Sequence, residues 1–142
     1  MKTSTRLVSI IFSLCSFMNL LHAQKVDNVP AMKPGSEWEN IDIQKIADDS
    51  LCTTFHIWIK AGVKHHFHTS HTECIYVIEG EGEMEYQDKT FKVKAGDYIT
   101  VPRGVIHAVT ASIPLHVLSI QTPQWVTDDR KFVEPIRRPH NE

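Results

Sequence analysis

The sequence lacks a strong excess of either charge, because 15 lysine and arginine residues stand against 17 aspartate and glutamate residues, a formal net charge of −2. Without a basic face, the chain has no electrostatic basis for binding nucleic acid. Cysteine is also scarce, with three in 142 residues, of which Cys52 and Cys74 lie beyond the N-terminal segment. Two cysteines do not make a disulfide framework, so we favour free thiols over a disulfide between them.

The sequence also lacks an apolar run of the ~20 residues that a typical transmembrane helix needs. Its longest run, residues 7–21, is almost wholly apolar, follows Lys2 and Arg6, and leads to the small residue Ala23. This order of basic, apolar and small residues is typical of a secretory signal peptide. We therefore expect residues 1–23 to be removed on export to the periplasm or the medium, leaving no membrane attachment. An uncleaved membrane anchor is the alternative.

No segment long enough for a major helix shows a 3.6-residue apolar period. Instead, short runs rich in β-branched and aromatic residues recur every ~8–12 residues between Gly, Pro and Asp turns, which indicates an all-β sandwich or barrel. A chain of 142 residues predicts one domain. We place an N-terminal arm at residues 24–40, a β-barrel at 41–126 and a C-terminal extension at 127–142, with a possible helical turn at 127–130.

Histidine and glutamate form the most specific pattern in the chain. His66 and His68 are two residues apart, so on an extended strand both side chains point to the same face. Glu73 has the wrong parity for the same straight strand, and the polar residues 69–72 before it predict a bend. His107 must come from a separate strand that folds back against the first. Together, these three imidazoles and one carboxylate can surround a single metal ion.

The first of these stretches resembles a motif of the cupin superfamily. In that motif, two histidines separated by one residue precede a glutamate and then a glycine. Here His66-Phe67-His68 is followed after four residues by Glu73, and after six more by Gly80. The opening glycine departs from the pattern, because Gly62 lies four residues before His66 rather than six.

The second stretch resembles the second cupin motif. Gly96 is followed after five residues by Pro102-Arg103-Gly104, and after two more by His107. The asparagine that closes the motif in the family is replaced by Ala111. The resemblance extends over roughly residues 41–121 and identifies the chain as similar to small, single-domain cupins of the type-2 kind.

The resemblance implies a small double-stranded β-helix, or jelly-roll barrel, with the motif ligands near its open mouth. The metal ligands that it implies are His66, His68, Glu73 and His107. Three nitrogen ligands and one carboxylate suit one divalent transition metal ion, which could be Fe, Mn, Zn, Ni, Co or Cu. On a six-coordinate ion, two positions would stay open for water, dioxygen or a substrate. Many cupins are homodimers, so a homodimer is expected here too.

A catalytic site needs a proton-transfer group near the metal beyond the ligands themselves. The candidates are His71, His56, Tyr98 and Arg103. For His71 we favour a solvated position or a contact with a ligand over the role of a substitute ligand. For His56 and His116 a structural role is the simpler interpretation. Arg103 could pair with a substrate carboxylate near the cavity mouth, although a solvated turn residue is the simpler alternative.

Two functions therefore stay open at this point. The first is an exported, metal-dependent enzyme of the dioxygenase, isomerase or lyase type that acts on a small organic molecule. The second is a non-catalytic module that binds a small molecule, a sugar or a metal. A roomy cavity with polar groups above the metal would favour turnover, whereas a filled barrel would favour binding.

Overall fold

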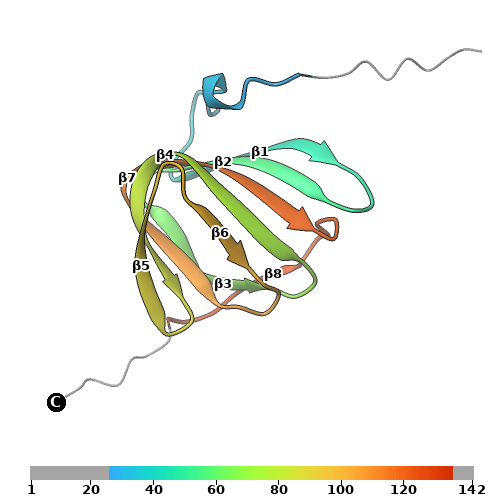
Figure 1. Ribbon diagram of the computed structural model, residues 1–142, viewed down its shortest axis with the longest axis vertical. Helices are drawn as coiled ribbons and strands as arrows, with labels where there is room; N and C mark the ends of the chain where they lie inside the picture. Colours follow the sequence, from blue (N-terminus) through green and yellow to red (C-terminus); the bar gives the residue numbers. More distant parts are fainter. Residues whose placement is uncertain (1–25, 136–142) are drawn as a thin grey trace, which may run out of the picture.

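A computed structural model describes residues 26–135, which form one curled antiparallel β-sheet (Figure 1). Its elements are η1 (Val29–Ala31), β1 (Ile41–Asp48), β2 (Thr53–Ile59), β3 (Gly62–His68), β4 (Thr72–Tyr86), β5 (Lys89–Lys94), β6 (Tyr98–Val101), β7 (His107–Thr122) and β8 (Arg130–Phe132). The predicted signal peptide lies outside the described residues. Residues 26–135 include no helix long and apolar enough to span a membrane.

The two longest strands, β4 and β7, organise the sheet. They pair with each other along most of their 15 and 16 residues, with register shifts near the middle. The first half of β4 also pairs with β6 and its second half with β5, while β7 pairs with β3 and then with β2. Because each long strand bends and pairs with different neighbours at its two ends, the sheet curls into a barrel, which confirms the predicted jelly-roll class.

Two glycines allow the curled backbone to pack closely. Gly80, which closes the first motif, has a φ of +93°, and a Cβ there would lie 2.2 Å from the carbonyl oxygen of Pro114. Gly62 lies off the motif position, yet a Cβ there would lie 2.4 Å from the carbonyl oxygen of Val109. A side chain at either position would push β7 away from its neighbour.

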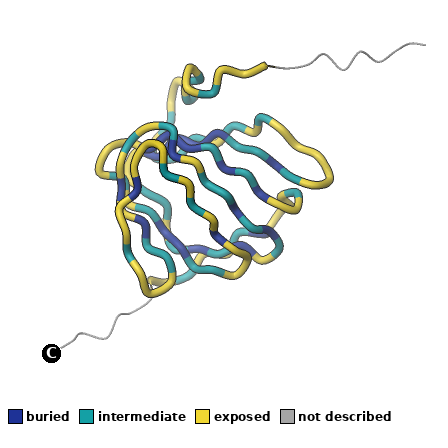
Figure 2. Tube along the Cα trace, in the orientation of Figure 1, coloured by how far each residue is buried: buried dark blue, intermediate teal, exposed yellow. Residues whose placement is uncertain are grey.

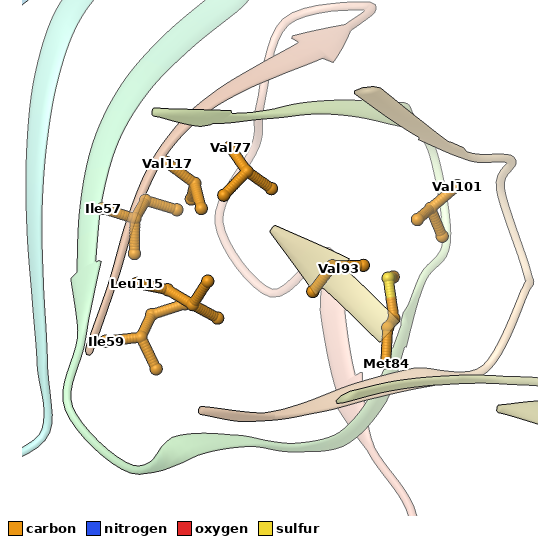
Figure 3. Packing of buried hydrophobic residues seen from close by; sticks show 8 residues of the cluster. All are labelled: Ile57, Ile59, Val77, Met84, Val93, Val101, Leu115 and Val117. Atoms are coloured by element: carbon orange, nitrogen blue, oxygen red, sulfur yellow. The ribbon is translucent and has the colours of Figure 1, made fainter. Parts of the chain in front are cut away.

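Apolar side chains point into the barrel from several strands (Figure 3), and the strands carry buried positions along their length (Figure 2). The buried cluster contains Ile57, Ile59, Val77, Met84, Val93, Val101, Leu115 and Val117. Cys52 and Cys74 are both free thiols, as the sequence favoured. The core and the predicted metal ligands are both parts of the barrel interior.

The C-terminal extension differs from its expected form. Residues 127–130 do not form a helical turn; a turn at 127–128 leads instead into the short strand β8. β8 pairs with β3, placing Arg130 opposite His68 and Phe132 opposite His66. The edge of β3 that β7 leaves free has unpaired backbone groups, and β8 satisfies them. The extension therefore completes the sheet beside the predicted ligands.

Candidate metal centre

The structure brings the four predicted ligands together inside the barrel. His66 and His68 come from β3, Glu73 from the start of β4, and His107 from the start of β7, directly opposite His66. All four are buried, and each offers one ligand atom such that these atoms lie within 4.8 Å of one another. The predicted bend between β3 and β4 is what gives Glu73 the orientation that a straight strand would deny it.

Backbone carbonyls fix the tautomer of two of the three rings. The Nδ1 atom of His66 donates to the carbonyl oxygen of Lys64 at 2.8 Å, and that of His107 donates to the carbonyl oxygen of Val105 at 3.0 Å. Because a carbonyl only accepts, the hydrogen of the neutral ring is on Nδ1 and the lone pair is on Nε2. Burial also lowers the pKa of His66 to about 3, so this ring is neutral at physiological pH.

Glu73 presents one carboxylate oxygen to the cluster and uses the other as an anchor. Its Oε1 accepts hydrogen bonds from the hydroxyl of Ser119 and from Nε2 of Gln121, the latter at 3.4 Å. Its Oε2 lies 3.3 Å from Nε2 of His68 and 3.4 Å from Nε2 of His107. Donation from Ser119 and Gln121 favours the ionised form of the buried carboxylate.

This arrangement fits a cation. The lone pair on Nε2 of His107 faces the ionised Oε2 of Glu73, and that Nε2 makes no hydrogen bond within the described residues. Two acceptors in such proximity repel each other unless a positive species lies between them. Three neutral imidazoles and one carboxylate are the donor set that divalent transition metals prefer, so this buried cluster could hold a metal ion.

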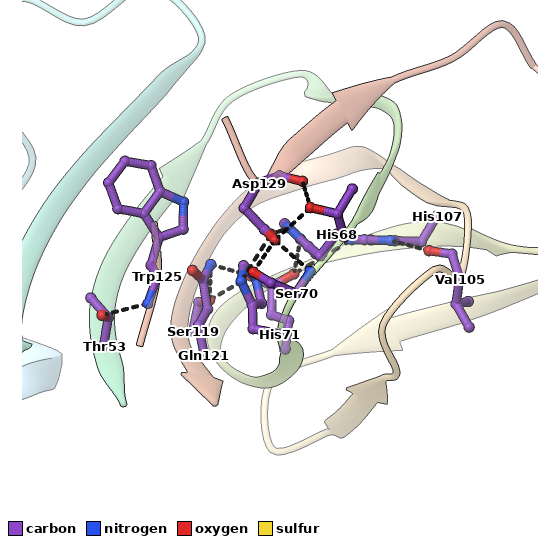
Figure 4. A network of polar contacts seen from close by, with 12 residues as sticks. Thr53, His68, Ser70, His71, Val105, His107, Ser119, Gln121, Trp125 and Asp129 are labelled. Carbon is purple, nitrogen blue, oxygen red and sulfur yellow. Dashed lines mark hydrogen bonds and ion pairs between the residues drawn. The ribbon is translucent and has the colours of Figure 1, made fainter. Parts of the chain in front are cut away.

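Asp129 supports the centre from the turn before β8 (Figure 4). Its Oδ2 accepts a hydrogen bond from Nδ1 of His68 at 3.1 Å, so the neutral ring keeps its lone pair on Nε2, which lies 3.3 Å from Oε2 of Glu73. Its Oδ1 accepts from the backbone N–H of Ser70 at 2.6 Å and from the hydroxyl of Thr69 at 3.0 Å. One buried carboxylate thereby fixes both the β3–β4 bend and the orientation of a predicted ligand.

His71 is buried in the bend rather than solvated. Its Nδ1 lies 2.9 Å from Oδ2 of Asp129, and its ring centroid lies 4.2 Å from that of His68. His68, His71 and Asp129 form a second group with metal-ligand spacing. Asp129 already accepts hydrogen bonds on both oxygens, however, so we interpret this group as a support for His68. For His71 this corresponds to the predicted contact with a ligand.

The other proton-transfer candidates lie away from the centre. His56 is buried on the outer face of β2, where its ring packs 5.2 Å from Trp58 and 4.9 Å from His116, in keeping with a structural role. Tyr98 is 61% exposed, and Arg103 lies exposed in the turn before β7. None of the three lines the cavity at the metal centre.

A narrow cavity of about 70 Å3 joins the centre to the barrel interior. His66, Glu73 and His107 are among its lining residues, and its remaining walls are apolar except at Arg130. Sequence reasoning missed Arg130, as it missed Ser119, Gln121 and Asp129. The alternation of polar Ser119 and Gln121 along an apolar strand was a weak signal for those two residues. Nothing in the sequence connects Asp129 and Arg130, just before and at the start of β8, to the motifs.

Comparisons with known proteins agree with this architecture. Residues 53–121 match a family model described as a cupin domain. L-ectoine synthase from Halomonas elongata is 32% identical over 109 residues, covering 74% of this chain and 78% of that protein. Acireductone dioxygenase from Rattus norvegicus is 31% identical over 130 residues, covering 85% of this chain and 66% of that protein.

Solved structures show the same fold at low identity. An uncharacterized protein with a double-stranded β-helix domain from Klebsiella pneumoniae superposes with a TM-score of 0.66 and 17% identity, over 79% of this chain and 99% of that one. KdgF from Halomonas sp. superposes with a TM-score of 0.60 and 18% identity, over 66% and 88% of the two chains. These similarities confirm the predicted double-stranded β-helix.

Proposed function

The chain belongs to the cupin family, and from its buried histidine–glutamate cluster we propose that it binds one divalent transition metal ion. The proposed ligands are Nε2 of His66, His68 and His107 and Oε2 of Glu73. The observation that carries this proposal is the arrangement of the rings, whose Nδ1 atoms all face acceptors, so that each ring in its neutral form directs an Nε2 lone pair into the cluster.

We further propose that the metal serves an enzyme that acts on a small organic molecule. A bound divalent ion would supply Lewis-acid or redox chemistry. The four side chains would leave positions open on a six-coordinate ion, and the adjoining cavity supplies space for a substrate. The named relatives include a synthase and a dioxygenase. Because these are different reaction types, the proposal keeps the dioxygenase, isomerase and lyase classes.

A non-catalytic module that binds a small molecule, a sugar or a metal is the second candidate. One observation favours it: among the described residues that line the cavity, the groups able to transfer a proton at neutral pH are the proposed metal ligands themselves. Turnover would then depend on proton transfer by the substrate, by water or by a ligand that leaves the metal.

Elemental analysis by plasma mass spectrometry tests the metal proposal. We expect about one transition metal ion per untagged chain purified without chelators, and its loss in His66→Ala and Glu73→Ala. His65→Ala is a matched control, because His65 adjoins His66 but contacts Glu85 at 3.2 Å outside the cluster. Iron would direct the search to oxygen-consumption assays, and zinc or manganese to isomerase and lyase assays. A chain that stays metal-free after refilling with each ion would contradict the proposal.

Export and assembly are separate proposals. We propose cleavage after Ala23, with the mature chain in the periplasm or the medium, and a homodimer as the assembled form. N-terminal sequencing of the mature protein would then begin at Gln24. Sedimentation equilibrium would give twice the mass of the cleaved chain; a single chain's mass would reject the dimer without affecting the metal centre.

A further inference from the structure

The cavity beside the metal centre has an unusual combination of walls. Apart from His66, Glu73 and His107, its lining consists of apolar side chains such as Ile57, Val77 and Leu115, plus a single cationic group, Arg130. A charged group beside apolar walls loses hydration, which costs free energy unless the charge is paired. An unpaired guanidinium beside this cavity therefore indicates a functional role.

Arg130 reaches the centre from β8. Its Cα lies opposite that of His68 in the β3–β8 ladder, so both side chains leave the sheet on the inner face. Among residues 26–135, no carboxylate lies within ion-pair distance of Arg130, and its side chain makes no hydrogen bond with another described residue. Its neighbour Asp129 accepts hydrogen bonds from His68 and from Ser70 in the β3–β4 bend instead.

The charges around the cavity call for an anion. A divalent ion held by Glu73 retains one positive charge, and Arg130 adds another at the same cavity. Asp129 offsets one of them through His68. The filled site would thus carry one net positive charge beside apolar walls, with Arg130 half-buried, and an unpaired charge is costly there to the extent that it is shielded from water. A monoanionic ligand would neutralise it.

The volume of the cavity limits the size of that ligand. An engineered cavity of about 150 Å3 lined by apolar side chains accepts benzene, a molecule of six carbon atoms. The cavity here is about 70 Å3, roughly half as large. It therefore suits an aliphatic body of roughly three carbon atoms.

We propose that Arg130 is the carboxylate-binding residue of the site and that the substrate class is short-chain aliphatic carboxylates. Its guanidinium pairs with the carboxylate through two parallel N–H donors, while the aliphatic body lies among the core side chains. This inference rests on the proposed metal-dependent function, because the metal contributes to the positive charge. It assigns to Arg130 the role that sequence analysis considered for Arg103, which lies exposed in a turn.

Titration of the metal-loaded protein with butanoate tests this proposal, with butanamide as its neutral equivalent and hexanoate as an oversized one. We expect calorimetry to give an affinity for butanoate at least about tenfold higher than for butanamide or hexanoate. The Arg130 Nε–H resonance, identified by its loss in Arg130→Gln, should shift only with butanoate. Arg130→Gln should abolish the preference, Arg130→Lys should restore part of it, and Arg103→Gln should leave it unchanged.

The metal content of every variant separates the two proposals. Arg130→Gln should keep the metal, because it removes no ligand. A wild-type chain without metal would overturn the proposed function. Two results with metal-loaded proteins would overturn the role of Arg130 alone. One is an equal butanoate affinity in wild type and Arg130→Gln, and the other is an equal loss of affinity in Arg130→Gln and Arg103→Gln. Circular dichroism and the Arg130→Lys variant distinguish a loss of binding from a loss of folding.

Discussion

The carboxylate of Asp129 lies 3.1 Å from Nδ1 of His68, although 61 residues separate the two in the chain. The corresponding atoms of His66 and His107 donate to backbone carbonyls only two residues away. Of the three rings, His68 is thus the one held by a distant side chain. Substitutions outside the motifs can alter its orientation and tautomer without touching a ligand.

Replacing that carboxylate should weaken metal binding. In Asp129→Asn the amide oxygen can still accept from Ser70, but the amide NH2 then faces Nδ1 of His68 and disfavours the required tautomer. We expect metal affinity to fall by about 10–100-fold, as for other groups that orient a ligand. Competition with a chromophoric chelator measures it. Asp128→Asn, at the exposed neighbouring position, is the control, and equal affinities in the two variants would reject this role.

The hydrogen bond from Ser119 to Glu73 should contribute less to metal affinity than Asp129 does. Ser119→Ala removes the hydroxyl that donates to Oε1 of Glu73, while Gln121 can still donate to the same oxygen. We expect a loss of metal affinity of roughly tenfold, the low end for groups that support a ligand. The same chelator competition tests it. Ser112→Ala removes an exposed hydroxyl bond to the backbone of Glu81 and should have no effect on metal affinity.

Gly80 and Gly96 offer a matched pair for stability, because both have a φ of +93°. A Cβ at Gly96 would have no heavy atom within 4 Å, whereas one at Gly80 would meet the backbone of Pro114 at 2.2 Å. We expect Gly96→Ala to lower the free energy of unfolding by roughly 1–2 kcal/mol, from backbone strain alone. Gly80→Ala should cost ~3 kcal/mol or more, because overpacking adds to the strain.

Urea denaturation of the two variants measures this difference. The wild-type chain and both variants are compared in metal-free buffer, so that metal binding does not add to stability. Equal losses at the two glycines would show that β4 and β7 can separate enough to admit a methyl group.

The buried His56 should make stability depend on pH. Burial lowers its pKa, and neither ring nitrogen has a hydrogen-bond partner among the described residues. As the pH falls below about 6.5, the unfolded chain takes up a proton on this ring before the folded chain does. Its contribution is therefore fully present above about pH 6.5 and is lost in more acidic solution.

Replacement by an apolar residue should remove that contribution. We expect His56→Leu to show a smaller decrease in the free energy of unfolding between about pH 7 and 5 than the wild-type chain. Urea denaturation of both metal-free proteins across this range measures it. Identical slopes would mean that the ring takes up its proton at the same pH in the folded and unfolded chains.

The proposed ligands could be identified from sequence because each motif is local. His66, His68 and Glu73 lie within eight consecutive residues, and the alternation of a strand together with one bend determines their orientation. The second motif carries its own glycine and proline turn before His107. The all-β class was equally accessible, since short strands between turn residues leave a regular pattern.

The residues around the ligands could not be identified in the same way. Gln121 reaches Glu73 through the register of β4 against β7, which no local pattern encodes. Asp129 and Arg130 lie just before and at the start of β8, which has only three residues and is too short to leave a strand pattern in the sequence. Strand alternation alone also fails to distinguish inside from outside, which is why Tyr98 was a candidate and is exposed.

The late position of Asp129 in the chain has a consequence during synthesis. A nascent polypeptide that has just passed His107 already carries all four proposed ligands, but it lacks the carboxylate that orients His68 and fixes the β3–β4 bend. Any metal captured at that stage would meet an unfinished, loosely held set of donors. On the proposed metal function, the ordered set of four donors is complete only once translation has passed β8, so a chain loaded with metal would be the finished protein.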